Sequence, residues 1–217
     1  MKRSSPALER LLHPALAFST RVREGGIVMP KKTVMSSLAD LPAIDRKSAD
    51  VNAVIETPKG SRAKFEYDEQ LCLFKLGGML PEGSMFPFNF GFIPSTRGED
   101  GDPLDLLVLM EEPAFTGCLV PSRLIGVIEA EQTDEDGKTM RNDRLIATAS
   151  HSREHADVES LKALSPHVIE EIEHFFVSYN QVRGKQFKPL GRHGAKRAKK
   201  LLEAGRRRRR RARANGQ

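Results

Sequence analysis

The stretch that decides the fold is Glu99-Asp100-Gly101-Asp102-Pro103-Leu104-Asp105, followed by the apolar run Leu106-Leu107-Val108-Leu109-Met110. In an extended segment Asp100 and Asp102 point to the same side, whereas Asp105 has the opposite parity. The backbone must therefore turn between them. Gly101 supplies the freedom to turn, and Pro103 fixes one φ. The apolar run is typical of a buried strand, which would hold the acidic turn on a rigid edge.

Three converging carboxylates predict a cation site. They repel one another unless a cation neutralises them, and hard oxygen ligands suit Mg²⁺ or Mn²⁺ best. A solvated acidic turn is the alternative that this motif alone leaves open. An EF-hand is disfavoured, because its loop needs glycine at position six and two flanking helices, whereas Asp105 stands at position six and a leucine-rich strand follows.

The charge of the chain is unevenly distributed. Residues 206–217 contain seven arginines and no acid, and residues 1–35 contain seven Lys or Arg against two Glu. The overall charge of +6 therefore leaves −6 on the residues between these ends. A chain of 217 residues suits one domain with tails. We expect an acidic globular body that holds the metal site, with a basic segment at each end.

Three segments follow from this composition. We expect a disordered basic extension over residues 1–48, a folded domain over residues 49–204 and a disordered arginine-rich tail over residues 205–217. Residues 1–23 also have the arginine-rich, acid-poor composition of an organelle transit peptide, and translation could instead begin at Met29 or Met35. The sequence does not separate these alternatives.

Cysteine usage and hydropathy favour a cytoplasmic location. Cys72 and Cys118 are the two cysteines, and without a secretory pattern we expect free thiols in a reducing compartment. No apolar stretch approaches the roughly 20 residues that span a bilayer, so no membrane partner is expected.

Short strands separated by turns fill most of the domain. The alternation of apolar and polar residues predicts strands over residues 51–58, 63–68, 71–74, 85–94, 106–110, 121–129 and 143–147. Gly77-Gly78 ends the third of these, and Asp136-Gly137 forms the tip of the last hairpin. The phenylalanines at alternate positions of 85–94 are interpreted as a core-filling ladder.

Two helices close the domain. Ser165-Pro166 begins the first, a core-facing stripe runs from Val168 to Tyr179, and Gly184 ends it. Residues 195–204 form a second, basic helix. Strands followed by helices indicate the α+β class, as a small barrel with helices packed outside. His151 and His155 stand four residues apart, but no third ligand for zinc is evident.

With these elements placed, the sequence resembles the soluble family I inorganic pyrophosphatases over roughly residues 51–204. The most specific match is Phe92-Ile93-Pro94 followed by the acidic turn and its apolar run. In the same order stand Val54-Ile55-Glu56, Lys64-Phe65-Glu66, Phe86-Pro87-Phe88-Asn89-Phe90-Gly91, and Phe175-Phe176 with Tyr179. The resemblance implies a small closed OB-like β-barrel with two packed C-terminal helices. It also implies hydrolysis of inorganic pyrophosphate to two phosphates with several Mg²⁺ ions, Mn²⁺ being possible. We further expect a homo-oligomer.

The resemblance assigns the acidic residues by position. Asp100 and Asp105 resemble metal ligands, and Asp102 resembles the residue that both ligates metal and takes the proton from the attacking water. Glu56 and Glu66 match acidic positions that hold metal-bound water or close the site.

The cationic side of the site is assigned in the same way. Lys64, Arg144 and Tyr179 match phosphate-binding positions. Hydrolysis of pyrophosphate needs an in-line water, charge neutralisation on both phosphates and a stabilised leaving phosphate. An acidic cluster that faces a basic one across a cavity meets these needs, and the sequence supplies residues for both.

Three phosphate-binding positions of the family differ in this chain. A phosphate-contacting tyrosine of the family is Phe90 here, which lacks the hydroxyl. An arginine that follows the third strand in the family falls at Gly78, where Lys75 is the nearest replacement. The lysine that usually follows the helix tyrosine is Asn180, for which Lys185 or Lys188 would compensate.

The hairpin of residues 121–147 departs further. Two aspartates of the family fall at Gln132 and Asn142, while Glu131 and Asp143 stand one residue away, on the opposite side of a regular ladder. We expect a bulge to re-aim Glu131 and Asp143 as metal ligands. These departures indicate a divergent subgroup with altered phosphate affinity.

A nucleic-acid-binding module is the competing hypothesis. OB-like barrels bind single strands, and the arginines of residues 206–213 form a ready phosphate-binding tail. Against it, the body is acidic and no basic stripe is interleaved with exposed aromatic residues. A weak contact between nucleic acid and the tail, beside the enzymatic activity, is the more plausible form.

Overall fold

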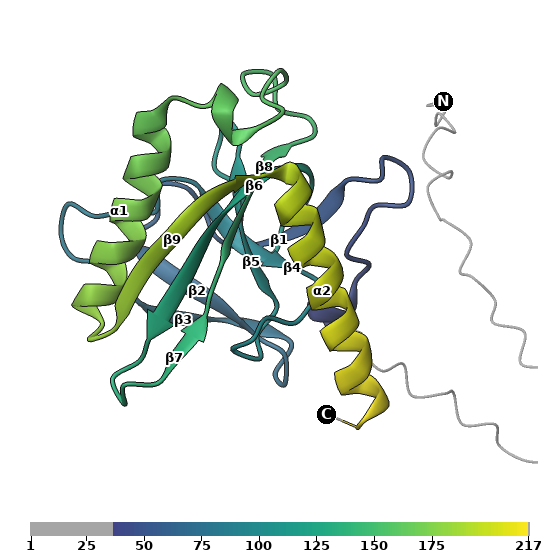
Figure 1. Cartoon of the computed structure of the whole chain (residues 1–217), viewed down its shortest axis with the longest axis horizontal. Helices are drawn as coiled ribbons and strands as arrows, with labels where there is room; N and C mark the ends of the chain where they lie inside the picture. Colours follow the sequence, from purple (N-terminus) through teal and green to yellow (C-terminus); the bar gives the residue numbers. More distant parts are fainter. Residues whose placement is uncertain (1–36, 217) are drawn as a thin grey trace, which may run out of the picture. The chain divides into compact units, whose positions relative to one another are not determined.

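The computed structural model describes residues 37–216 (Figure 1). The transit-peptide and start-codon alternatives, and most of the expected N-terminal extension, lie outside them. In chain order the elements are η1 (Leu38–Asp40), β1 (Val51–Thr57), β2 (Ala63–Asp68), β3 (Leu73–Met79), β4 (Asn89–Ile93), β5 (Leu104–Leu109), β6 (Leu119–Thr133), β7 (Thr139–Arg141), β8 (Arg144–Ala149), η2 (Leu161–Ala163), α1 (Pro166–Val182), β9 (Gln186–Gly194) and α2 (Ala195–Ala214).

Five strands form a ring. β1 pairs with β4, β4 with β5, β5 with β8, β8 with β6, and β6 with β1. Only the β5–β8 pair within this ring is parallel. β7 and β9 pair with β6 outside the ring, and β2 and β3 form a separate hairpin. This mostly-sheet architecture with two helices confirms the predicted α+β class. The strand β9, which lies between the two helices, was not predicted.

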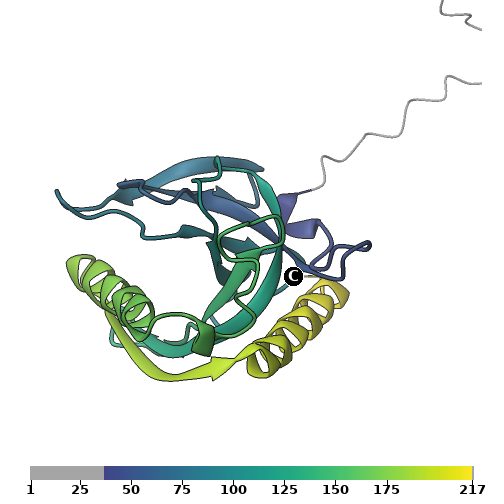
Figure 2. The same ribbon diagram turned by 90° about the horizontal axis from the view of Figure 1, so that it is seen from above.

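The helices lie on two sides of the ring. Seen from above, α1 and α2 stand apart, with β9 running between them (Figure 2). Ile172 and Phe176 of α1 pack in a core cluster with Phe86 and Phe90. Ala198 and Leu202 of α2 belong to a second core cluster. Both helices therefore bury an apolar stripe against the strands.

The apolar run after the acidic turn is buried on both faces. Leu106 and Val108 of β5 belong to the cluster of α2, whereas the alternate residues Leu107 and Leu109 belong to the cluster of α1. All four are at most 1% exposed. Because successive side chains of a strand point to opposite faces, a continuous apolar run is what this position requires. The buried strand predicted here is confirmed.

The strand β3 is longer than predicted and includes two glycines. β3 continues through Gly77 and Gly78 to Met79. A Cβ at Gly77 would lie 2.6 Å from the carboxyl carbon of Glu66. Glycine at this position therefore leaves room for the Glu66 side chain beside the strand, and the pair does not end the strand.

The C-terminal tail differs most from the sequence expectation. α2 does not stop at Ala204 but continues through six consecutive arginines to Ala214. Arginine is a good helix former, and Gly205 and Ala212 are buried against the body. Several of the arginines pair with carboxylates of the domain, as described below. The disordered tail expected over residues 205–217 is therefore corrected to a helix up to Ala214. Residues 37–48 likewise include η1.

Three smaller expectations concern the cysteines, the His151–His155 pair and membrane-spanning segments. Cys72 and Cys118 are free thiols. His151 lies in a turn and not on a helix. Within residues 37–216, no helix is long and apolar enough to cross a membrane.

Gly91→Ala tests the packing of β4 against β1. A Cβ at Gly91 would lie 2.0 Å from the backbone oxygen of Val54, which cannot move without breaking the ring. We expect the free energy of unfolding to fall by about 3 kcal/mol, measured by urea denaturation. Gly194→Ala is the control, because a Cβ there meets nothing within 4 Å. A Gly91→Ala variant as stable as this control would contradict the packing described.

Candidate functional site

A cavity of about 730 Å³ lies beside the acidic turn. It is walled by β1, the β2–β3 hairpin, the turn before β5, the β6–β7–β8 hairpin and the C-terminal part of α1. Among its lining residues are Glu56, Lys64, Glu66, Lys75, Asp100, Asp102, Asp105, Gln132, Asn142, Arg144, Tyr179, Arg183, Lys185 and Arg209. The structure thus brings together nine of the eleven residues predicted for the site.

The acidic turn forms one wall. Gly101 has a φ of 99°, the left-handed conformation that the turn requires. The Asp102 N–H donates to Asp100 Oδ1 at 3.2 Å, and the Gly98 N–H donates to the Asp102 carbonyl at 2.6 Å. These bonds hold the loop so that the side chains of Asp100, Asp102 and Asp105 all line the cavity despite their unequal parity.

The carboxylates of this wall are held close to one another at an energetic cost. Burial, followed by repulsion from Asp105 and Asp102, raises the pKa of Asp100 to about 6. Burial and repulsion from Asp105 also raise the pKa of Asp102. Burial raises the pKa of Glu56 to about 8, although the Tyr67 N–H donates to its Oε1 at 2.8 Å. The cations of the site therefore do not fully compensate these groups.

Lys64 and Arg183 form the opposite wall with Tyr179. Lys64 Nζ lies 2.5 Å from Glu66 Oε1 and 6.0 Å from the centroid of the Tyr179 ring. The Arg183 guanidinium donates to the Tyr179 hydroxyl and lies 3.9 Å from Glu66 Oε1. Sequence reasoning missed Arg183. Its position four residues after Tyr179, at the C-terminal cap of α1, was the available signal.

Arg144 links the two walls. Its Nη1 donates to Asp105 Oδ2 and to Asn142 Oδ1. The guanidinium carbon lies 4.8 Å and 5.2 Å from the ring centroids of Phe176 and Phe187. Its buried Nε has no hydrogen-bond partner within residues 37–216. A buried guanidinium in this state retains capacity to donate to an anion.

The remaining predicted cation lies at the rim. Lys75 lines the cavity, but its Nζ pairs with Asp68 Oδ2 at 3.0 Å and its side chain is 58% exposed. Lys185 also lines the cavity and pairs with Asp134 at 2.9 Å. Of Lys75, Lys185 and Arg183, it is Arg183 that contacts predicted site residues, namely Tyr179 and Glu66, and it lines a small pocket together with Gly78.

The hairpin presents amides, not carboxylates, to the cavity. Gln132 and Asn142 line it, and the Asn142 amide donates to Gln132 Oε1 at 3.2 Å. Asp143 instead accepts from the Ala130 N–H at 3.0 Å and from Arg141 Nη2 at 2.7 Å. Glu131 is not among the lining residues either. Neither residue lines this cavity, although Asp143 lines a smaller pocket together with Asp100 and Asp105. The bulge expected to turn Glu131 and Asp143 into the cavity is therefore not found, and their role as metal ligands stays a prediction.

The register explains this outcome. β6 does contain irregularities, between Leu124 and Gly126 against β8 and between Glu129 and Ala130 against β9. Both precede Glu131, and from there β6 and β7 pair regularly. Alternation along a regular ladder then places Gln132 and Glu131 on opposite faces.

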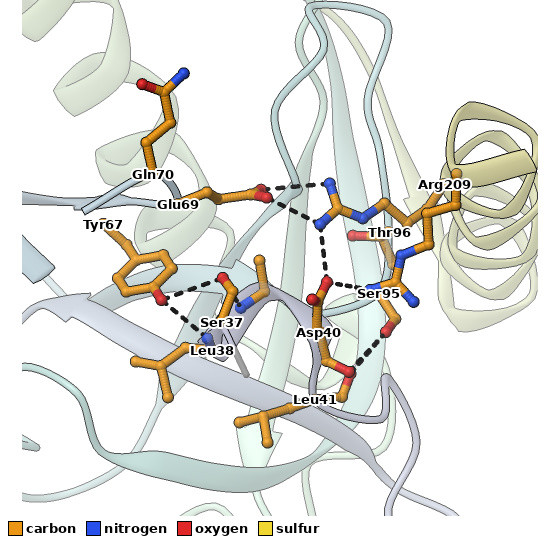
Figure 3. A network of polar contacts seen from close by, with 12 residues as sticks. Ser37, Leu38, Asp40, Leu41, Tyr67, Glu69, Gln70, Ser95, Thr96 and Arg209 are labelled. Carbon is orange, nitrogen blue, oxygen red and sulfur yellow. Dashed lines mark hydrogen bonds and ion pairs between the residues drawn. The ribbon is translucent and has the colours of Figure 1, made fainter. Parts of the chain in front are cut away.

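The β2–β3 hairpin, which carries Lys64 and Glu66, is fastened at its turn by α2. Arg209 donates to both carboxylate oxygens of Glu69, at 2.8 and 3.5 Å, and to Asp40 Oδ1 at 3.0 Å (Figure 3). The Tyr67 hydroxyl accepts from the Leu38 N–H at 2.9 Å and contacts Ser37 Oγ at 3.1 Å (Figure 3). A residue near the C-terminus thereby helps to position one wall of the cavity.

Known proteins are similar to this chain in sequence and in fold. The family model described as "Inorganic pyrophosphatase" matches residues 53–210. The chain belongs to the inorganic pyrophosphatase family. An inorganic pyrophosphatase of Nostoc is 34% identical over 166 residues, which cover 76% of this chain and 95% of that protein. One from Halalkalibacterium halodurans is 35% identical over 153 residues, which cover 70% and 91%.

Solved structures of pyrophosphatases agree. The crystal structure of inorganic pyrophosphatase from Thermus thermophilus matches with a TM-score of 0.73 and 34% identity, over 80% of this chain and 99% of that one. The enzyme from Helicobacter pylori matches with a TM-score of 0.68 and 31% identity, over 83% and 99%. The predicted family resemblance and the predicted OB-like fold are confirmed.

The residues present fit the metal dependence that is general in this family. In residues 37–216, no three His, Cys, Asp or Glu side chains are already arranged to hold one ion. Asp105 is instead paired with Arg144, and Glu66 with Lys64. Yet the raised pKa values of Asp100, Asp102 and Glu56 show carboxylates that a divalent cation would relieve. The donor set is all oxygen, as Mg²⁺ prefers.

The raised pKa values of Asp100 and Glu56 predict how the stability of the metal-free protein changes with pH. Folded Asp100 and Glu56 keep their protons up to about pH 6 and about pH 8, whereas in the unfolded chain they lose them near pH ~4. The folded state therefore binds more protons in this range, so the free energy of unfolding falls as pH rises from about 5 to about 8.

Urea denaturation in EDTA measures this profile. Asp100→Asn should remove the part of the slope below about pH 6, and Glu56→Gln the part up to about pH 8. A wild-type profile that rises across the window, or a slope unchanged in both variants, would refute the assigned pKa shifts.

Proposed function

We propose that this chain hydrolyses inorganic pyrophosphate to two phosphates with Mg²⁺. The observation that carries the proposal is the cavity in which Asp100, Asp102 and Asp105 face Lys64 and Arg144. Pyrophosphate with Mg²⁺ is the ligand that satisfies both walls at once, because the metal meets the carboxylates and the phosphate oxygens meet the cations.

The acidic residues have different roles. Asp100 and Asp105, with Glu56 and Glu66 behind them, would hold Mg²⁺. Bound Mg²⁺ supplies neutralisation of phosphate charge and lowers the pKa of water towards neutrality. Asp102, at the tip of the turn, accepts the proton of the attacking water. Its raised pKa makes it a better proton acceptor than an ordinary aspartate.

The cationic residues hold the phosphates. Lys64 and Tyr179 lie together on one side, and the buried Arg144 lines the cavity beside Asp105. Substrate binding would exchange the contacts of Arg144: the guanidinium leaves Asp105 for a phosphate oxygen, which frees the Asp105 carboxylate for metal. Mn²⁺ is an alternative ion for the same oxygen ligands.

A nucleic-acid-binding barrel is the weaker candidate for the main function. Such a site stacks bases on exposed aromatic residues, but Phe86, Phe90 and Phe92 are at most 4% exposed. A homo-oligomeric state and a cytoplasmic location stay predictions of the family resemblance and the composition.

Asp102→Asn tests the assigned proton acceptor. We expect the kcat for phosphate release from pyrophosphate to fall about 10²- to 10⁴-fold, because the amide cannot take the proton of water. Asp136→Asn is the matched control, since Asp136 lies at the exposed tip of the hairpin. A phosphate-release assay that finds the two variants equally active would exclude this role of Asp102.

Arg183→Gln tests whether this arginine binds substrate. We propose that Arg183 compensates for the missing cation at Gly78, so its loss should raise KM for pyrophosphate about tenfold. Lys188→Gln removes an equal charge from β9, outside the cavity, and should leave KM unchanged. Equal KM values for the two variants would show that Arg183 has no part in substrate binding.

A further inference from the structure

The inner face of α2 packs against the rest of the domain. Ala198, Leu202, Gly205 and Ala212 are buried against the strands. The helix carries eleven Lys or Arg and a single acid, Glu203. Five of these cations pair with carboxylates, namely Arg197 with Glu129, Arg206 with Glu203, Arg208 with Glu99, Arg209 with Asp40 and Glu69, and Arg213 with Asp40.

The other six cations form an outer stripe. All are exposed, and their side chains have no ion pair or hydrogen bond within the described part of the chain. The outer stripe consists of Lys196, Lys199, Lys200, Arg207, Arg210 and Arg211. At 100° per residue they fall within an arc of about 120°, opposite the buried residues. From Lys196 to Arg211 the stripe is about 22 Å long.

A groove continues the cationic surface at the C-terminal half of α2. It has a volume of about 420 Å³ and lies between α2 and residues 42–46. Arg46, Arg206 and Arg210 are among the residues that line it. A nucleic-acid phosphate bound at Arg210 of the outer stripe would therefore also lie near the guanidinium groups that line the groove.

We propose that the outer stripe of α2 binds the sugar-phosphate backbone of duplex nucleic acid without sequence preference. A straight row of cations on a helix matches the regular line of phosphates along a duplex. α2 lies along the outside of the strands, so the stripe faces away from the ring (Figure 1). None of the residues of the outer stripe lines the cavity beside the acidic turn. Arg209, which lines both that cavity and the groove, is not part of the stripe.

Two other partners fit the surface less well. A helix that lies on a membrane needs apolar side chains towards the lipid, but the large apolar residues that are exposed in this protein lie outside α2. Single strands are bound by stacking of bases on aromatic rings, and α2 contains no aromatic residue. The surface therefore favours contacts to phosphates alone.

One consequence rests on the proposed function. Template-directed polymerisation of nucleoside triphosphates releases pyrophosphate at nucleic acid. A pyrophosphatase held on the duplex would consume that product where it forms.

Fluorescence polarisation with a labelled DNA duplex of about 20 base pairs, longer than the stripe at 3.4 Å per pair, tests the proposal on the full chain. Six phosphate contacts predict that log K falls with log salt at a slope of about −5, a loss of about 10³-fold between 50 and 200 mM salt. The triple variant Lys199→Gln/Lys200→Gln/Arg207→Gln should bind about tenfold or more weakly at 50 mM salt and roughly halve the slope.

The matched control Lys138→Gln/Lys162→Gln/Arg153→Gln removes the same charges from exposed positions elsewhere and should bind like the wild type. Both variants should release phosphate from pyrophosphate at the wild-type rate, which separates this test from that of the catalytic site. The proposal is overturned if the wild type does not bind the duplex at 50 mM salt, or if the α2 variant binds as well as the wild type. It is also overturned if both triple variants weaken binding equally, or if acidic vesicles are bound in place of the duplex.

Discussion

Repulsion among the carboxylates of the acidic turn is the constraint on which the site depends. Asp100, Asp102 and Asp105 share one cavity wall, and the pKa of Asp100 rises to about 6 as a result of burial and this repulsion. The fold tolerates the cost because β5 is buried on both faces and fixes the turn. The contact of Arg144 with Asp105 offsets part of it. A divalent cation that binds in the cavity would neutralise the remaining repulsion, so this repulsion favours metal binding.

The placement of Arg144 follows from the strand topology. β5 and β8 run parallel, so their first residues, Leu104 and Arg144, lie at the same end of the ring. The acidic turn leads into one strand and the cation begins the other. α1 then adds Tyr179 and Arg183 across the cavity, while α2 fastens the hairpin that carries Lys64 and Glu66. Each wall is thus held by a different element.

Local sequence patterns predicted much of this structure. The alternation of apolar residues located β1 to β6 and β8, and Ser165-Pro166 located the start of α1, whereas β7 and β9 were not predicted. The extent of α2 was not predictable from local pattern, because a run of arginines is typical of disorder unless distant acids pair with it. Glu69 lies 140 residues from Arg209. The orientation of Glu131 and Asp143 depended in the same way on where β6 departs from regular pairing, which composition does not reveal.

The most direct test of the account is phosphate release by the purified chain from pyrophosphate, ATP and polyphosphate, with Mg²⁺ and with Ca²⁺. A cavity that matches two phosphates between its walls predicts rapid release from pyrophosphate with Mg²⁺, much slower release from the longer substrates, and loss of activity with the larger and less geometrically demanding Ca²⁺. Equal or faster release from ATP or polyphosphate, or no Mg²⁺-dependent release from pyrophosphate, would contradict it.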